Sequence, residues 1–455
     1  MQEDLIEGDE WDVLIAGGGV AGAATAAALA PLGLKILVVE PGPSQARRLA
    51  GELIHPPGID GLRQLGLLAE GTPLGAPVHG FAVFPFSEGA DAAMLLPYGA
   101  VREHRTPGYA IEHRLLKAHL LAQVQSLPGV TVWLGARVVG MERDPGPAFR
   151  AVVRHGRGQT ALRARLVVGA DGPRSPVRKL IGIPHQTQRY SGMLGVEVAD
   201  THLPHGGYGN IFLTPTGVAY AYGIGAGRAR VMFEVLKGAD PGASIRVQLG
   251  AFPVPFRRDV ERALAAGKPL AAANFCIIPD GTVKANVALV GDARGCCHPL
   301  TASGITAAVK DALILRDALC EAGFDVTLAL RRYARLCGRL QLTRRTLAEE
   351  LREAFLAETP ETLLLSQCIF AYWRASPGGR IRSMALLSSL DNSLVSLAWQ
   401  YTLVALQAFR LLPRWLKSRT LGSWCRGLLK FFHKSLKFQQ AALRQRVEER
   451  LALGD

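Results

Sequence analysis

The chain has 455 residues, of which 49% are hydrophobic and 20% charged, and its formal net charge is +14. This length exceeds what one hydrophobic core organises, so we expect two or three packing units. The hydrophobic content excludes a disordered chain. The seven cysteines show no CxxC pair and no metal-ligand spacing, so we expect no metal site and a reducing compartment. The N-terminus lacks an apolar stretch, so we expect no signal peptide.

Residues 12–40 read as strand, glycine turn, helix and strand. Gly17, Gly19 and Gly22 form a GxGxxG pattern between an apolar run and a small-residue helix. The three glycines permit a tight turn, a close approach of phosphate to the backbone, and close packing of helix on strand. A pyrophosphate would lie at the helix N-terminus, where free N–H groups favour anions. Glu40 ends the second strand, where a carboxylate can accept hydrogen bonds from ribose hydroxyls, so the segment predicts a dinucleotide site.

Two later strands also end in an acid. Residues 169–178 read GADGPRSPVR, and Asp171 stands between a strand and a short helix. Alone, this acid could simply cap the helix. Asp292 ends the strand of residues 287–291, and Gly304 opens a long helix after it. A carboxylate there could bind a ribityl hydroxyl, and the helix N-terminus could face the electron-rich N1–C2=O edge of a flavin.

These three motifs, in this order, resemble those of the group A FAD-dependent monooxygenases of the p-hydroxybenzoate hydroxylase type over residues 10–345. GELIHPPG at 51–58 and HPLTASGITAAV at 298–309 are similar to stretches of squalene monooxygenase (squalene epoxidase). The resemblance implies an FAD site made by the motif residues and by further matching positions: Gly17, Gly19, Val20, Ala21, Gly22, Glu40, Arg48, Arg114, Val138, Asp171, Asp292, Gly304 and Ile305.

The resemblance also implies catalytic candidates beside the flavin. Tyr98 matches a family tyrosine that orients a glutamine, and the position of that glutamine is His55 here. Histidine can change charge near neutral pH, and it alters the hydrogen bonding beside the flavin. Where the family has three consecutive glycines, this chain has Ala302-Ser303-Gly304. The two added side chains narrow the space beside the flavin ring.

In such enzymes reduced FAD reacts with O2 to give a C4a-hydroperoxide. The resemblance therefore implies insertion of one oxygen atom, by epoxidation or hydroxylation, into a lipophilic and isoprenoid-like substrate. The sequence has no second GxGxxG, so NADPH or NADH would reduce the flavin directly or through a separate reductase. Three alternatives stay open: an FAD-dependent reductase of polyprenyl double bonds, an aromatic hydroxylase of a prenylated quinone or quinolone, and a non-catalytic isoprenoid carrier.

The expected fold is α/β, with a Rossmann-type FAD-binding domain, an inserted β-sheet substrate domain and a helical, membrane-associated C-terminal region. We expect FAD-binding segments at 1–75, 111–188 and 285–345, substrate-domain segments at 76–110 and 189–284, and the helical region at 346–455. Aromatic residues of the middle sheet are candidates to line a substrate cavity, although half or more would be ordinary core: Phe212, Tyr220, Tyr222, Phe233 and Phe275. We expect His298 to cap the turn that follows it.

The C-terminal tail mixes basic and apolar residues. Residues 392–455 contain eleven Lys or Arg and three acids, which is +8 of the total charge. The apolar stretch 394–409 falls short of the ~20 residues that span a bilayer, and the composition fits helices that lie in a membrane interface. A nucleic-acid partner is not expected, because no binding fold accompanies the charge. We expect peripheral or monotopic attachment to the cytoplasmic face of the cytoplasmic membrane.

Overall fold

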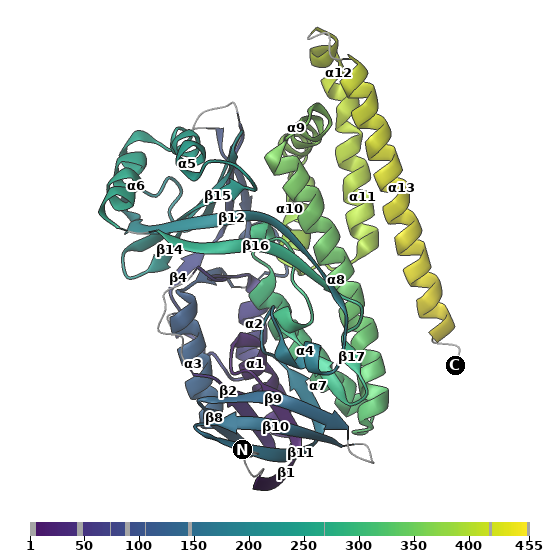
Figure 1. The fold of residues 1–455 in the computed structure, drawn as a ribbon. Coiled ribbons are helices and arrows are strands. Elements are labelled where there is room, and N and C mark those ends of the chain that lie inside the picture. The colour runs from purple at the N-terminus through teal and green to yellow at the C-terminus, as the bar shows by residue number, and fades with distance from the viewer. Residues whose placement is uncertain are drawn as a thin grey trace.

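The chain folds around two large sheets that are followed by a layer of C-terminal helices. Figure 1 shows the computed structural model, coloured from purple at the N-terminus to yellow at the C-terminus. The structure describes residues 6–42, 49–72, 74–86, 92–104, 106–143, 148–267, 269–417 and 421–452.

The first sheet is built on parallel strands. In spatial order its strands are β17 (Val283–Lys284), β18 (Val287–Leu289), β11 (Gly158–Gly169), β1 (Ile6–Ala16), β2 (Ile36–Glu40) and β8 (Val130–Leu134), and antiparallel β10 (Phe149–His155) and β9 (Ala136–Arg143) continue from β11. The apolar run of β2 is buried along its whole length, because parallel strands are covered on both faces. Four adjacent parallel strands, β18, β11, β1 and β2, end at one edge of the sheet.

Helices cover one face of this sheet, and α4 (Pro176–Leu180) packs with β9 and β10 on the other. The covering helices are α1 (Val20–Leu29), α3 (His113–Gln125) and α7 (Gly304–Glu321). The alanines of α1 are almost fully buried, so this helix can lie close to both α7 and the strands.

The second sheet has seven strands and lies above the first in Figure 1. Its strands are β16 (Leu270–Pro279), β12 (His185–Ala199), β15 (Arg228–Leu236), β14 (Gly217–Gly225), β13 (Gly209–Thr214), β5 (Gly80–Phe84) and β6 (Met94–Pro97). Side chains alternate between its faces. One face packs on α5 (Pro241–Leu249) and α6 (Val254–Ala266), and the other joins a hydrophobic cluster with the C-terminal helices.

A small third sheet connects the two large ones. It consists of β3 (Leu53–Ile54), β7 (Gly108–Ala110) and β4 (Ala76–Val78), and α2 (Pro56–Gln64) starts directly after β3. The segment 76–110 therefore contributes β5 and β6 to the second sheet, whereas its β7 pairs with β3 on one side and with β4 on the other.

The region after residue 346 is helical, as the sequence predicts. The helices are α8 (Val326–Leu356), α9 (Pro360–Ala375), α10 (Pro377–Leu387), α11 (Leu394–Ala405), α12 (Gln407–Lys417) and α13 (Leu421–Ala452). The apolar stretch 394–409 is divided between α11 and α12. Over the described parts of the chain, every helix is too short or too polar to cross a bilayer.

A buried ion pair holds the second sheet against β3. The Arg230 guanidinium of β15 donates through Nε and Nη2 to the two Glu52 carboxylate oxygens at 3.0 and 2.9 Å. Tyr222 adds a hydrogen bond to Glu52 at 3.2 Å, and Arg230 Nη1 reaches Glu197 at 3.0 Å. Loss of one member of a buried pair leaves an uncompensated charge and costs about 3–5 kcal/mol. This pair therefore fixes the segment that leads into His55.

Candidate flavin and substrate site

The glycine turn after β1 requires its glycines. Gly17 has φ +107°, and a Cβ there would lie 2.5 Å from the Ala170 carbonyl oxygen. A Cβ on Gly22 would lie 1.8 Å from the Gly17 carbonyl oxygen, whereas a Cβ on Gly19 would meet no atom within 4 Å. The open side at Gly19 adjoins Val20 and Ala21 at the start of α1, whose first N–H groups have no side-chain cap. This geometry suits a bound anion.

Glu40 stands where a ribose would lie beside the turn. Its Oε2 accepts from the Gly18 N–H at 2.7 Å, and its Oε1 accepts from Lys117 at 2.8 Å and from the Gly42 N–H at 3.1 Å. The carboxylate is therefore held in one orientation, with lone pairs left for hydroxyl donors. The sequence reasoning missed Lys117, although it stands one helical turn after Arg114 on α3.

Asp171 is committed to its own turn. It accepts hydrogen bonds from the Ser175 hydroxyl at 2.5 Å and from the Val177 N–H at 2.8 Å, as a capping acid does. Arg178 of the same motif is buried and donates to the carbonyl oxygens of Pro173 and Ala293, both at 2.7 Å. The second motif thus packs against the glycine turn through Ala170 and is hydrogen-bonded to the third motif through Arg178.

The third motif is held by a fully buried ion pair. Arg294 binds both oxygens of Asp311 on α7 at 2.9 Å, and Asp311 also accepts from the Gly291 N–H at 2.8 Å. Asp292, between these residues, is accessible to water, although desolvation by the surrounding protein raises its pKa. Its carboxylate makes no hydrogen bond with any described residue. The Asp292 carboxylate is therefore available to bind a hydroxyl-bearing ligand.

α7 packs against the turn that carries Asp292, and its N-terminus is open. Gly304 is exposed, and the side chain of Ser303 does not cap the helix. Ile305 packs against Gly51 of the GELIHPPG stretch, where a Cβ would contact it at 3.7 Å. Glycine turn, Glu40, Asp292 and α7 thus meet at the carboxyl edge of the first sheet, where open α/β sheets bind ligands. These residues fit FAD: Glu40 would hold the adenosine ribose, the α1 N-terminus the pyrophosphate, and Asp292 the ribityl chain.

Two predicted cofactor residues, Arg114 and Val138, lie outside this geometry, and a third cannot be placed in it. Arg48 lies outside the described residues. Arg114 at the start of α3 is 61% exposed and pairs with Glu112 at 3.3 Å. Val138 lies in β9, and its side chain is buried in the core of the first sheet.

His55 and Tyr98 form a buried pair beside the start of α2. The Thr301 carbonyl can only accept, so His55 Nε2 carries the proton and donates to it at 2.8 Å. Nδ1 then accepts from the Tyr98 hydroxyl at 2.6 Å. His104 contacts the edge of the Tyr98 ring and is hydrogen-bonded to Ser388 at 2.9 Å. The structure therefore brings together the two catalytic candidates and ties them to the turn before α7.

Burial moves the pKa of His55 away from neutral pH. Desolvation by burial lowers its pKa to about 4, and the nearby positive groups of His104, Lys310 and Arg344 act in the same direction. His55 is therefore neutral at pH 7. The sequence shows the residue type but not the burial that removes its charge.

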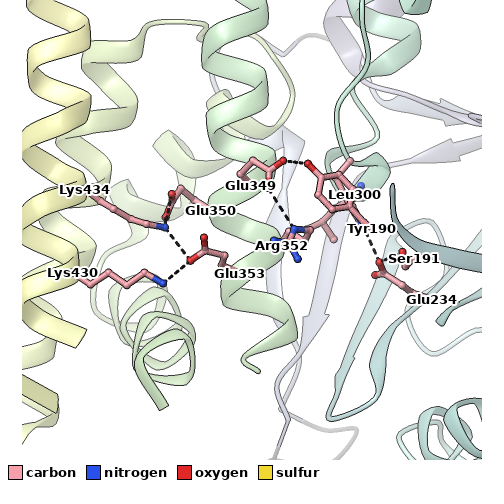
Figure 2. Close-up of polar contacts among 11 residues, drawn as sticks. Tyr190, Ser191, Glu234, Leu300, Glu349, Glu350, Arg352, Glu353, Lys430 and Lys434 are labelled. Atoms are coloured by element: carbon pink, nitrogen blue, oxygen red, sulfur yellow. Dashed lines mark hydrogen bonds and ion pairs between the residues drawn. The ribbon is translucent and has the colours of Figure 1, made fainter. Parts of the chain in front are cut away.

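His298 caps its turn as predicted, since its Nδ1 accepts from the Leu300 N–H at 3.3 Å. The sequence reasoning missed its second contact, because Nε2 lies 3.0 Å from Glu234 of β15. Glu234 is buried and also accepts from Ser191 of β12 at 2.5 Å. Figure 2 shows Ser191 and Glu234 beside Tyr190, which is held from α8 by Glu349 and Arg352. This network locks the turn before α7 onto the second sheet.

The aromatic candidates of the second sheet divide between its faces. Tyr220 and Tyr222 belong to the cluster that faces the C-terminal helices. Phe212 and Phe233 lie on the opposite face, packed with α5 and α6, and are ordinary core residues. Phe275 of β16 is partly buried.

A dinucleotide cleft on a parallel sheet, joined to a second sheet through the turn before α7, defines an FAD-dependent monooxygenase of the squalene epoxidase and aromatic hydroxylase type. Residues 10–217 match the family model described as "FAD binding domain". Residues 163–421 match the family model described as "Squalene epoxidase". The chain belongs to the squalene epoxidase family.

Individual relatives agree with this assignment. The chain is 28% identical over 331 residues to a squalene epoxidase, erg1, of Aspergillus fumigatus, covering 68% of this chain and 66% of that one. It is 27% identical over 329 residues to the ubiquinone hydroxylase UbiL of Rhodospirillum rubrum, covering 68% and 72%. Among solved structures, PqsL of Pseudomonas aeruginosa in complex with 2-aminobenzoylacetate aligns with a TM-score of 0.64 and 28% identity, covering 77% and 97%.

The buried neutral state of His55 predicts a pH dependence of stability. The folded-state pKa is about 4 and the ordinary value is 6.5, so between these values the unfolded chain binds more protons. Stability is full above pH 6.5 and falls as the pH drops towards 4, by about 3 kcal/mol from this residue. Gln in its place can donate to Thr301 and accept from Tyr98 without titrating. Urea denaturation between pH 7 and 4 should therefore show a smaller stability loss in H55Q than in the unmodified chain, and equal losses would contradict the assignment.

Proposed function

We propose that the chain uses FAD and O2 to insert one oxygen atom, by epoxidation or hydroxylation, into a lipophilic substrate of isoprenoid type. FAD bound in the cleft would supply the electrons that activate O2, and NADPH or NADH would restore them. His55 and Tyr98 would place an uncharged, hydrogen-bonded pair of side chains beside the reacting atoms, and the packed second sheet would exclude water.

The observation that carries the proposal is one continuous hydrophobic cluster. It runs from Tyr98 and Leu300 beside the flavin cleft, across the second sheet, into the C-terminal helices as far as Phe431 of α13. An apolar cluster of this size beside the cleft favours an apolar substrate there. Names of the relatives support this substrate class, since the squalene epoxidases and the ubiquinone hydroxylase are named for isoprenoid molecules.

A second candidate is hydroxylation of an aromatic ring that carries an isoprenoid chain. It is supported by the similarity to the ubiquinone hydroxylase UbiL and by that to PqsL. The two candidate reactions share the cleft and the hydrophobic cluster beside it, and they differ only in the chemical group that is oxidised.

The outer face of the C-terminal helices supports attachment to a membrane. Apolar side chains of α13 repeat at helical spacing on one face and are strongly exposed: Leu429 70%, Phe432 51%, Leu436 54% and Leu443 63%. Trp399 of α11 is 58% and Phe409 of α12 is 49% exposed. A continuous exposed apolar face of this kind marks a membrane or protein contact.

Part of the basic charge of this region points inward. Figure 2 shows Lys434 between Glu350 and Glu353 of α8, at 2.8 and 3.0 Å, and Lys430 at 3.0 Å from Glu353. Arg426 pairs with Glu361 of α9 at 2.9 Å. These cations fasten α13 to the body of the protein, so we infer that apolar burial drives membrane attachment more than attraction to anionic lipid does.

Oxygen labelling tests the proposed reaction. The purified chain, supplied with FAD, NADPH, a reductase and 18O2, should convert squalene or a prenylated quinone into a product with one 18O atom. Formation of hydrogen peroxide alone with every lipid tried would contradict oxygen insertion, and anaerobic turnover without oxygen in the product would select the double-bond reductase.

G22A should be inactive because its Cβ collides with the turn that holds FAD, whereas G206A, whose Cβ would meet no atom within 4 Å, should retain activity.

Vesicle flotation tests the membrane proposal. The triple variant L429S/F432S/L436S should remain with the soluble fraction while the unmodified chain floats with vesicles, because about 1.5–3 kcal/mol per buried apolar side chain is lost. L328S is the matched control, because Leu328 on α8 is 54% exposed, as Leu436 is. Equal flotation of the triple variant and the control would show that this face does not bind lipid. FAD content of the variants, measured by absorbance, checks that the fold is kept.

A further inference from the structure

Arg344 is a buried cation that lies outside all three flavin motifs. It projects from α8 towards the start of α7 and is only 8% exposed. Its Nε donates to the Ser303 hydroxyl at 3.3 Å, and its Nη1 donates to Gln341 at 3.0 Å. Ser303 directly precedes the first residue of α7, so the guanidinium stands beside the N-terminus of that helix.

Among the residues that the structure describes, Arg344 has no carboxylate partner. Arg230 is neutralised by Glu52 and Glu197, and Arg294 by Asp311. For Arg344, by contrast, no described carboxylate lies within 4.0 Å of the guanidinium, and no described residue accepts a hydrogen bond from its Nη2. A buried charge without a partner is costly. The arrangement indicates that an anion completes it.

Arg344 lies close enough to Asp292 for their charges to interact. Its positive charge counteracts the desolvation that raises the pKa of Asp292, and it lowers the pKa values of Lys310 and His55. His55, Asp292 and Lys310 of α7 are thus all within range of the Arg344 charge. The first N–H groups of α7 add partial positive charge at the same place.

Bound FAD would bring the missing negative charge. Two-electron reduction of the flavin with uptake of one proton leaves one negative charge, spread over the N1–C2=O edge of the ring. We propose that Arg344, acting with the N-terminus of α7, is the cation that balances this charge and so sets the reduction potential of the bound flavin. This inference rests on FAD binding in the cleft and assigns Arg344 as a positioning residue for the charge of the reduced cofactor.

Anaerobic measurements on the FAD-loaded chain test the proposal without substrate or O2. Sulfite adds to oxidised flavin and places negative charge on the same edge of the ring, so its affinity reports the local cation. R344Q retains an amide near Ser303 but loses the charge. We expect its sulfite dissociation constant to rise about tenfold and its two-electron midpoint potential to fall by the equivalent, about 30 mV. Failure of the proposed oxygen insertion would leave both values unchanged.

Two further variants separate charge from structure. R344K keeps the cation, so its potential and sulfite affinity should stay near those of the unmodified chain. R335M removes a cation from the exposed face of the same helix and should change neither quantity. If R344Q binds FAD with unaltered potential and sulfite affinity, or if R344K shifts them as far as R344Q does, the proposal is wrong. If R344Q fails to hold FAD while R344K holds it, Arg344 acts in binding the cofactor, and its assignment to the flavin potential is overturned.

Discussion

The buried ion pair of Glu52 and Arg230 determines where the second sheet meets the flavin cleft. Glu52 lies three residues before His55, and Arg230 is the third residue of β15, so the pair fixes the site segment directly to the sheet. Burial of both groups makes the pair intolerant of loss of either partner. The hydrogen bonds of His55 to Tyr98 and Thr301 depend on this register, because the three groups come from segments far apart in the chain.

Buried charge is organised in the same way around the third motif. Asp311, paired with Arg294, also accepts a hydrogen bond from the backbone of Gly291 and so fixes the position of the neighbouring Asp292. Arg344 contributes a cation without a carboxylate partner among the described residues, while His55 nearby stays neutral because burial lowers its pKa. The cleft is therefore positive at the N-terminus of α7 and uncharged at His55. Such a division suits a cofactor that gains charge on one edge and a substrate that carries none.

Local patterns in the sequence predicted the cleft well. The glycines of the first turn, Glu40 and Asp292 stand at strand ends, and strand ends of a parallel sheet necessarily meet at one edge. The sequence could not show which hydrogen bonds Asp171 makes as a cap, since its partners depend on the exact turn. Arg344 and Glu52 were missed for a different reason. Their roles arise from contacts between segments tens to hundreds of residues apart, and burial, which gives those charges their meaning, has no local signature.

The central claim is that the three motifs form one FAD cleft whose flavin ring ends at the N-terminus of α7. A crystal structure of the FAD-loaded chain tests it most directly. The account predicts the adenosine ribose at Glu40 and the N1–C2=O edge of the ring at the N–H groups of Gly304 and Ile305, on the side of Arg344. A ring bound away from α7, with Asp292 and Arg344 out of contact with the cofactor, would contradict it.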